Sequence, residues 1–391
     1  MRQYCLPFAT FFAGMFSAPT PDQFSFFEVA ISLFLIMYVV TSKLEFRYRR
    51  KISENLMFYS KKWWLYILIF PPSLVGFLYG NDLNPIIRDV VPMLFMLLFV
   101  FSNRNQKTKL DILVLGIISM GVFYSIRFLL LPSVNLSSIG GATQWGSRDY
   151  FPQDPSVLFA SVMLLNFSYY WLRTNKLLLS GMSIILFFIP YFALLIMGVR
   201  SGVILPVLAL MVFILFKERY HFVKYFISVG IVFVLYHLLG VGAFDSIIDK
   251  FVVFGFNNKD NEVNDVLAHF SKYPLTIFFG QGWGGSFYSS IYDAPSRYVH
   301  NIFFYFWFKC GLVGLTFSIY LFYTVFIKNI RPFLKDAYSK KFLLKYCAIV
   351  ALIPSFLVQP TYKSLSFGCL VAIIFIIREN RYASKNMHNN P

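Results

Sequence analysis

Long apolar runs, each about the length that crosses a bilayer, recur along this 391-residue chain. A transmembrane helix needs about 20 predominantly apolar residues, and some cross with about 17. Lipid offers the backbone no hydrogen-bond partners, so a chain that crosses it is helical. We therefore expect an all-α integral membrane protein with about 12 transmembrane helices. The runs lie at 4–20, 24–41, 63–80, 86–102, 110–131, 156–172, 177–198, 201–216, 225–241, 300–326, 346–360 and 364–377.

The composition also indicates that lipid surrounds most of the chain. Hydrophobic residues make up 58% of it and charged residues 14%, whereas soluble domains average about 45–50% and about 25%. The net charge of +17 would suggest nucleic acid in a soluble protein, but here we expect the excess Lys and Arg to orient helices. No nucleic-acid partner is expected. The four cysteines show no paired spacing, which predicts neither a disulfide framework nor a metal site.

Basic residues are concentrated in every second connection between the expected helices. Most of the 35 Lys and Arg residues lie there, and the positive-inside rule places these connections and both termini in the cytoplasm. The first run follows Arg2 without a small-residue cleavage site, so we interpret it as a helix and not as a signal peptide. We expect transmembrane helices 1–9 in residues 1–241, a large outer loop in 242–299, and helices 10–12 with a cytoplasmic tail in 300–391.

The large outer loop is long enough to indicate a function of its own. Apolar residues recur at helical spacing over 247–252 and 263–270, which predicts two short amphipathic helices on the outer membrane face. A glycine-rich turn follows, Gly280-Gln-Gly-Trp-Gly-Gly285, but it lacks the Lys-Ser/Thr ending of a nucleotide-binding loop. The aromatic faces of Trp283 and Tyr288 suit either sugar binding or the membrane interface.

Arg200 is the first candidate for chemistry, because it lies between two apolar runs in Gly198-Val-Arg-Ser-Gly202. A planar guanidinium beside a helix N-terminus suits a phosphate group. An arginine here can equally mark the tip of a helical hairpin and extend its charge to the interface. The residues alone leave both interpretations open.

His300 opens the tenth apolar run and is a candidate general base, since a neutral imidazole accepts a proton near neutral pH. The alternative is a histidine that anchors the helix at the interface. Arg297 lies three residues earlier, where one helical turn would place it on the same face, and arginine charges would keep the ring neutral. Lys309 is expected roughly 13 Å deeper along the helix. It either pairs internally, for example with Glu28, or faces a water-filled cavity.

Four local patterns follow one another between residues 145 and 326. They are Asp154-Pro-Ser156 at the start of a run, Arg200-Ser-Gly202 at an outer hairpin, Tyr273-Pro274 with Phe279-Gly-Gln-Gly-Trp-Gly284, and His300-Asn301 followed by Gly311 and Gly314. In this order, and on the outer side of the membrane, they resemble the O-antigen polymerase and O-antigen ligase superfamily of bacterial envelope glycosyltransferases.

The resemblance implies a GT-C-like fold and a metal-independent, cofactor-free glycosyltransferase in the bacterial inner membrane, with a periplasmic site. Its donor would be an oligosaccharide on undecaprenyl pyrophosphate, embedded in membrane lipid. By the family's pattern His300 would be the catalytic base and Arg200 would bind the pyrophosphate. A second family arginine aligns with Lys259, which lacks the bidentate fork, and Arg297 is the candidate to replace it. Lys309 stands where the family often has an acidic residue.

Three functions fit this resemblance and topology. A polymerase passes the glycan to a sugar hydroxyl of another lipid-linked repeat unit, with a chain-length regulator protein as a candidate partner. A ligase passes it to lipid A core. A lipid-linked oligosaccharide flippase would show charges deep in several helices and short outer loops, whereas this sequence shows few deep charges and one large loop. The aromatic-rich composition and the modest loop length favour the polymerase.

Overall fold

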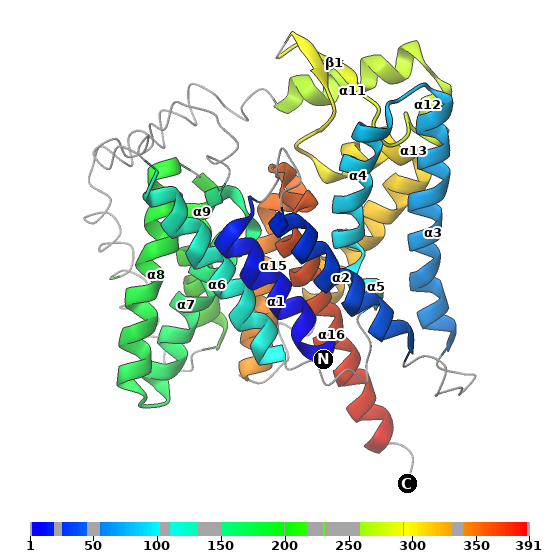
Figure 1. Cartoon of the computed structure of the whole chain (residues 1–391). Coiled ribbons are helices and arrows are strands. Elements are labelled where there is room, and N and C mark those ends of the chain that lie inside the picture. The colour runs from blue at the N-terminus through cyan, green and yellow to red at the C-terminus, as the bar shows by residue number, and fades with distance from the viewer. Residues whose placement is uncertain are drawn as a thin grey trace. The chain divides into compact units, whose positions relative to one another are not determined.

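The computed structural model describes residues 2–18, 26–44, 55–101, 110–131, 151–198, 200–217, 230, 259–291, 293–330 and 339–388. These residues are mostly helical, with one two-stranded antiparallel hairpin (Figure 1). The chain divides into two compact units, each with its own internal packing. Unit 1 consists of Met1–Ile36, Lys107–Gly255 and Pro332–Ala351, and unit 2 consists of Met37–Gln106, Phe256–Arg331 and Leu352–Pro391.

Unit 1 is helical throughout its described part. Its elements are α1 (Arg2–Phe16), the first part of α2 (Phe26–Leu44), α6 (Leu110–Leu129), the 3-10 turn η3 (Phe151–Gln153), α7 (Pro155–Arg173), α8 (Leu177–Met197), α9 (Arg200–Lys217) and most of α15 (Lys340–Leu357). Helix α6 packs against α1, α7 and α8. Gly121 lets α6 approach α7 closely, because a Cβ there would come within 2.2 Å of the Ser156 carbonyl oxygen.

Asp154 fixes the start of α7. Its Oδ1 accepts hydrogen bonds from the backbone N–H of Ser156 at 2.8 Å and from the Ser156 hydroxyl at 2.6 Å. Pro155 is the first helical residue, where its missing N–H removes nothing from the helix. The prediction that Asp154-Pro-Ser156 opens a helix is therefore confirmed, and its role is that of a helix cap.

Unit 2 combines helices with the described part of the predicted outer loop. Its elements are the rest of α2, α3 (Asn55–Leu78), α4 (Leu83–Met96), α5 (Leu98–Phe101), α11 (Lys259–Lys272), α12 (Leu275–Phe279), β1 (Phe287–Ser289), β2 (Ala294–Ser296), α13 (Ile302–Phe322), the π-helical turn η4 (Tyr323–Ile327), the 3-10 turn η5 (Pro360–Lys363) and α16 (Leu365–His388). Helix α13 packs against α3 and α12, and α16 packs against α4 and α5. Within this unit, α11 and the hairpin lie beyond the ends of α3 and α4 (Figure 1).

Four helices among the described residues are long and apolar enough to cross a membrane. They are Leu110–Leu129, Pro155–Arg173, Leu177–Met197 and Ile302–Ile330, and shorter apolar helices accompany them. Each apolar run of the sequence contains a helix element, except 225–241, of which the structure describes only residue 230. The prediction of a helical membrane protein is confirmed at this level, whereas about 12 spans and a GT-C-like fold stay predictions.

The described part of the outer loop contains one predicted and one unpredicted element. The amphipathic helix expected over 263–270 is confirmed as α11, whose Val266 and Phe270 are buried. The ring of Phe270 lies 4.9 Å from that of Trp307 in α13. The other expected helix, over 247–252, lies outside the described residues. The hairpin that pairs Phe287 with Ser296 was not predicted.

Candidate active site

His300 lies immediately before α13 and not inside it. Asn301 is the N-cap, and its side-chain oxygen accepts hydrogen bonds from two backbone N–H groups of the first turn at 2.9 and 3.4 Å. Asparagine is strongly preferred at this position, so the helix begins after it. Residues 297–300 are consequently not helical. The prediction that one helical turn places Arg297 and His300 on a common face is wrong.

The imidazole of His300 is held by Glu262 of α11. Nδ1 lies 2.7 Å from Oε1 and 2.9 Å from Oε2, and the backbone N–H of His300 donates to Oε2 at 3.1 Å. Glu262 is 2% exposed, and the His300 side chain is 23% exposed. An ionised carboxylate only accepts hydrogen bonds, so in the neutral ring Nδ1 carries the proton and Nε2 is an acceptor. Among the described residues, no hydrogen bond reaches Nε2.

Glu262 changes the electrostatic surroundings that the sequence suggested. We expected arginine charges beside the ring, but among the described residues the charged group that pairs with it is a carboxylate. A carboxylate at Nδ1 fixes the tautomer and stabilises the imidazolium that forms when Nε2 takes up a proton. Arg297 is exposed and, within the described part of the chain, makes no ion pair or hydrogen bond. Its guanidinium is therefore accessible to a ligand.

Two predicted phosphate-binding side chains are not described. Arg200 opens α9 in unit 1, and Lys259 opens α11 in unit 2, but the structure describes only the backbone at these positions. The predicted roles of Arg200 and Lys259 in binding pyrophosphate stay predictions. Of the predicted site residues, His300 and Arg297 are those whose side chains the structure describes.

Helix α13 is interrupted ten residues beyond Asn301. Gly311 has φ 62° and ψ −150°, which is not helical. The interruption frees carbonyls at the end of the first helical segment, and the glycine-rich turn supplies their donors: the N–H of Gln281 donates to Phe308 at 2.7 Å, and that of Gly282 donates to Lys309 at 3.0 Å. The backbone amides of this turn thus bind protein carbonyls, which agrees with the expectation that it is not a phosphate loop.

The same glycine-rich turn also hydrogen-bonds to helix α3, next to the prolines of that helix. Pro72 has no N–H to donate to the carbonyl of Leu68, and the indole N–H of Trp283 donates to that carbonyl at 2.9 Å. The backbone N–H of Trp283 donates to the Pro72 carbonyl at 3.0 Å. Trp283 is fully buried. The prediction that it presents a face to sugar or to the membrane interface is wrong, whereas Tyr288 is exposed.

Lys309 pairs with a carboxylate inside the protein. Its Nζ donates to Oδ2 of Asp89 in α4 at 2.7 Å and to the carbonyl of Gly285 at 2.6 Å. Lys309 is 0% exposed and Asp89 is 5% exposed. An internal partner was one of the two predicted alternatives, but the partner is Asp89. Glu28, which the sequence suggested, instead accepts a hydrogen bond from Ser17 at 2.7 Å.

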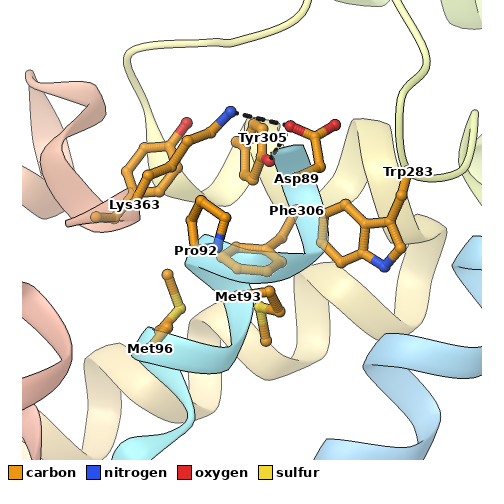
Figure 2. A pocket seen from close by; sticks show the side chains of 9 residues that line it. Asp89, Pro92, Met93, Met96, Trp283, Tyr305, Phe306 and Lys363 are labelled. Carbon is orange, nitrogen blue, oxygen red and sulfur yellow. Dashed lines mark hydrogen bonds and ion pairs between the residues drawn. The ribbon is translucent and has the colours of Figure 1, made fainter. Parts of the chain in front are cut away.

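The Asp89 carboxylate accepts hydrogen bonds from three further donors. The backbone N–H of Gly284 donates to Oδ2 at 3.0 Å, while the Tyr305 hydroxyl at 3.3 Å and Lys363 Nζ at 3.2 Å donate to Oδ1. Figure 2 shows Lys363 and Tyr305 directed at the Asp89 carboxylate. A buried carboxylate is tolerated when it is paired and fully hydrogen-bonded, and Asp89 meets both conditions. This charge cluster joins α4, the glycine-rich turn, α13 and η5.

A small cavity of about 10 Å³ lies beside the charge cluster, roughly the space of one water molecule. Its lining consists of Asp89, Pro92, Met93, Met96, Trp283, Tyr305, Phe306, Tyr362 and Lys363 (Figure 2). The Tyr362 hydroxyl donates to the carbonyl of Val299 at 2.7 Å. Val299 precedes His300, so this bond ties η5, and with it Lys363, to the segment that carries the histidine.

The described residues offer a proton acceptor, a fixed carboxylate and accessible cations. This set suits attack by a hydroxyl on a centre whose leaving group is an anion. No three His, Cys, Asp or Glu side chains gather as metal ligands among the described residues. The absence of a metal and of a cofactor from the reaction stays a prediction.

No protein-family model matches the chain, and neither curated proteins nor solved structures give a match. A function for this chain is therefore inferred from the geometry of unit 2 and from the sequence patterns.

Proposed function

We propose that this protein is a membrane glycosyltransferase that elongates a surface polysaccharide. It would transfer a glycan from undecaprenyl pyrophosphate to a sugar hydroxyl of another lipid-linked repeat unit. The observation that carries the proposal is the pairing of His300 with Glu262, 2.7 Å apart, with Nε2 of the ring as an acceptor. Such a pair is the arrangement that a general base for a hydroxyl nucleophile needs.

The reaction assigns one role to each described group. The acceptor hydroxyl gives its proton to His300 Nε2 as its oxygen forms a bond to the anomeric carbon of the donor sugar. The bond from that carbon to the phosphate oxygen breaks, and the electron pair leaves with the lipid pyrophosphate. Glu262 stabilises the imidazolium through Nδ1. Cations must neutralise the leaving group. Arg297, three residues before His300, is an accessible cation among the described residues.

The contacts inside unit 2 support an outer-face location for this site. The connections at 81–85, 242–299 and 361–363 are all outer connections in the predicted topology. Within unit 2, hydrogen bonds link the second to the third, and link both to Asp89 of α4, the helix that follows the first connection. We propose a multi-pass protein of a bacterial inner membrane, with about 12 transmembrane helices, a GT-C-like fold, both termini in the cytoplasm and a periplasmic site. A chain-length regulator protein is the proposed partner.

The direct test is a reaction of the purified protein with defined lipid-linked repeat units, analysed as a glycan ladder. Elongation of one lipid-linked repeat by another supports the polymerase. Transfer to lipid A core, with no ladder, would assign the protein as a ligase. A deletion strain separates the same two enzymes, since loss of a polymerase leaves core capped by one repeat, whereas loss of a ligase leaves bare core and lipid-linked polymer.

A lipid-oligosaccharide flippase is the second candidate, and the buried charge cluster favours it. Transporters place ionisable residues beside interrupted helices to bind substrates and coupling ions. Here Lys309 pairs with Asp89 two residues before the interruption at Gly311. Purified protein in liposomes distinguishes the two functions. Movement of a labelled lipid-linked repeat across the bilayer, without glycosidic bond formation, would assign the protein as a transporter and not as an enzyme.

A further inference from the structure

The charge cluster of unit 2 contains one more cation than it needs. Two ammonium groups, of Lys309 and Lys363, face the single carboxylate of Asp89. Lys309 alone neutralises that carboxylate, and it does so at the shorter distance, 2.7 Å against 3.2 Å. The backbone N–H of Gly284 and the Tyr305 hydroxyl hold Asp89 further. Asp89 therefore stays paired and hydrogen-bonded when Lys363 turns elsewhere.

The two lysines differ in burial and in the use of their donors. Lys309 is fully buried and donates to both Asp89 and the Gly285 carbonyl. The Lys363 side chain is 17% exposed, and its Nζ lies 4.5 Å from the centre of the Tyr305 ring. Within the described part of the chain, Asp89 is the one hydrogen-bond acceptor of Lys363. An ammonium has three donors, so Lys363 keeps donors for a ligand.

The position of Lys363 follows from its neighbour. Tyr362 is fully buried and donates to the carbonyl of Val299 at 2.7 Å. The 3-10 turn η5 is thereby fixed to the strand-to-helix connection that carries Arg297 and His300. The connection that carries the base is therefore hydrogen-bonded to the residue before Lys363.

We infer that Lys363 is the cation of a phosphate-binding site beside this cavity, taking an oxyanion of a diphosphate. The inference rests on the proposed function for its physiological ligand, which is the pyrophosphate headgroup of the lipid donor. On binding, an unused ammonium hydrogen of Lys363 donates to the phosphate oxygen, and Lys309 continues to balance the charge of the Asp89 carboxylate. An ammonium is a point charge suited to phosphate, and a charge-assisted bond of this kind is among the strong hydrogen bonds.

The test is calorimetric binding to the full-length protein in detergent micelles. The probes are geranylgeranyl diphosphate, inorganic pyrophosphate and geranylgeraniol, which carries no phosphate. Lys363→Met should weaken diphosphate binding about tenfold or more, as the loss of one charge-assisted hydrogen bond does. Lys363→Arg should keep most of the affinity, because a guanidinium also binds phosphate. The matched control is Lys272→Met, which removes an exposed lysine from α11 of the same unit and should leave binding unchanged.

The probes also separate the two sources of phosphate. A Lys363-dependent affinity for geranylgeranyl diphosphate supports a lipid headgroup, and one confined to inorganic pyrophosphate supports a free anion. Unchanged diphosphate binding in Lys363→Met, with Lys363→Arg and Lys272→Met also unchanged, would overturn the inference. A glycan ladder made by a Lys363→Met protein of wild-type affinity would sink the inference and leave the proposed function standing. Lys363-dependent binding without any glycosidic bond formation would overturn the proposed function and leave the inference standing.

Discussion

Glu262 holds His300 by three contacts, two to Nδ1 and one from the backbone N–H of the same residue. One buried carboxylate thus fixes both the ring and the chain that carries it. The two residues are far apart in sequence and meet because α11 lies beside the connection into α13. A histidine whose orientation is set in this way is prepared for proton transfer at Nε2 before substrate arrives.

Glu262→Gln should lower kcat more than about tenfold with little change in KM. The amide keeps a hydrogen-bonding shape but lacks the charge that stabilises the imidazolium, and it favours the wrong tautomer in part of the molecules. The measurement is the initial rate of glycan extension at varied acceptor concentration. Asp265→Asn on the same helix is the control, because Asp265 binds Ser290 and not the histidine. Equal kcat values for Glu262→Gln and the wild type would refute the positioning role.

Asp89→Asn should lower the free energy of unfolding by about 3–5 kcal/mol, because it leaves buried Lys309 without a counterion. The matched control is Asp111→Asn, which breaks an exposed pair with Lys340, and it should cost about 0–1 kcal/mol. Asp89→Asn with Lys309→Met should recover part of the loss. The check is unfolding of the purified protein in detergent. Similar losses at the two aspartates would contradict the account of the buried cluster.

Gly282→Ala should destabilise unit 2 by about 1–3 kcal/mol through crowding. Gly282 has φ +78°, and a Cβ there would lie 2.1 Å from the backbone nitrogen of Gly76 in α3. Gly181→Ala in α8 is the control, since nothing lies within 4 Å of its Cβ position. That change should be neutral or stabilising, because alanine favours a helix over glycine. Thermal melting of both variants decides, and a tolerated Gly282→Ala would argue against tight packing of the turn.

The outer loop should loosen in mild acid because of His269. Burial lowers the pKa of His269 from its usual 6.5, and Lys272 lowers it further, whereas the hydrogen bond that His269 Nε2 makes to Gln281 Oε1 opposes this shift. The unfolded loop then binds the proton more readily than the folded loop. The stabilisation is complete above pH 6.5 and declines as the pH falls below it. After correction for the intrinsic pH dependence of amide exchange, the protection factors of 259–285 should therefore be lower at pH 5 than at pH 7.5, and His269→Gln should weaken this difference. Equal pH dependence in His269→Gln would exclude this histidine as the cause.

The helical, membrane-spanning character of the chain could be predicted because apolar runs of fixed length have one solution in lipid. The start of a helix at Asp154-Pro-Ser156 and helix α11 followed from local patterns that need no tertiary information. The start of α13 was misplaced because the apolar run begins at His300, whereas capping by Asn301 sets the true first residue. Local chemistry at one asparagine decided a boundary that hydropathy could not resolve.

The partners in the site depended on contacts between distant segments. Glu262 lies 38 residues from His300, and Asp89 lies 220 residues from Lys309. One signal was present in the sequence: an aspartate within the apolar run 86–102 requires a buried cation, and Lys309 in another run was the available one. Nothing comparable singled out Glu262 among the polar residues of the loop. The burial of Trp283 could not be predicted either, because it depends on a hydrogen bond to the Leu68 carbonyl, which Pro72 leaves without its helical donor.

The measurement that tests the central claim most directly is glycan extension by His300→Gln beside His269→Gln. Both proteins lose a histidine of the 259–300 segment of unit 2, but only the first loses the proposed proton acceptor. Both are purified in parallel and compared for expression and melting temperature, then given the same lipid-linked repeats. The account predicts no ladder from His300→Gln and a ladder of ordinary length from His269→Gln. Chains of ordinary length from a folded His300→Gln protein would contradict it.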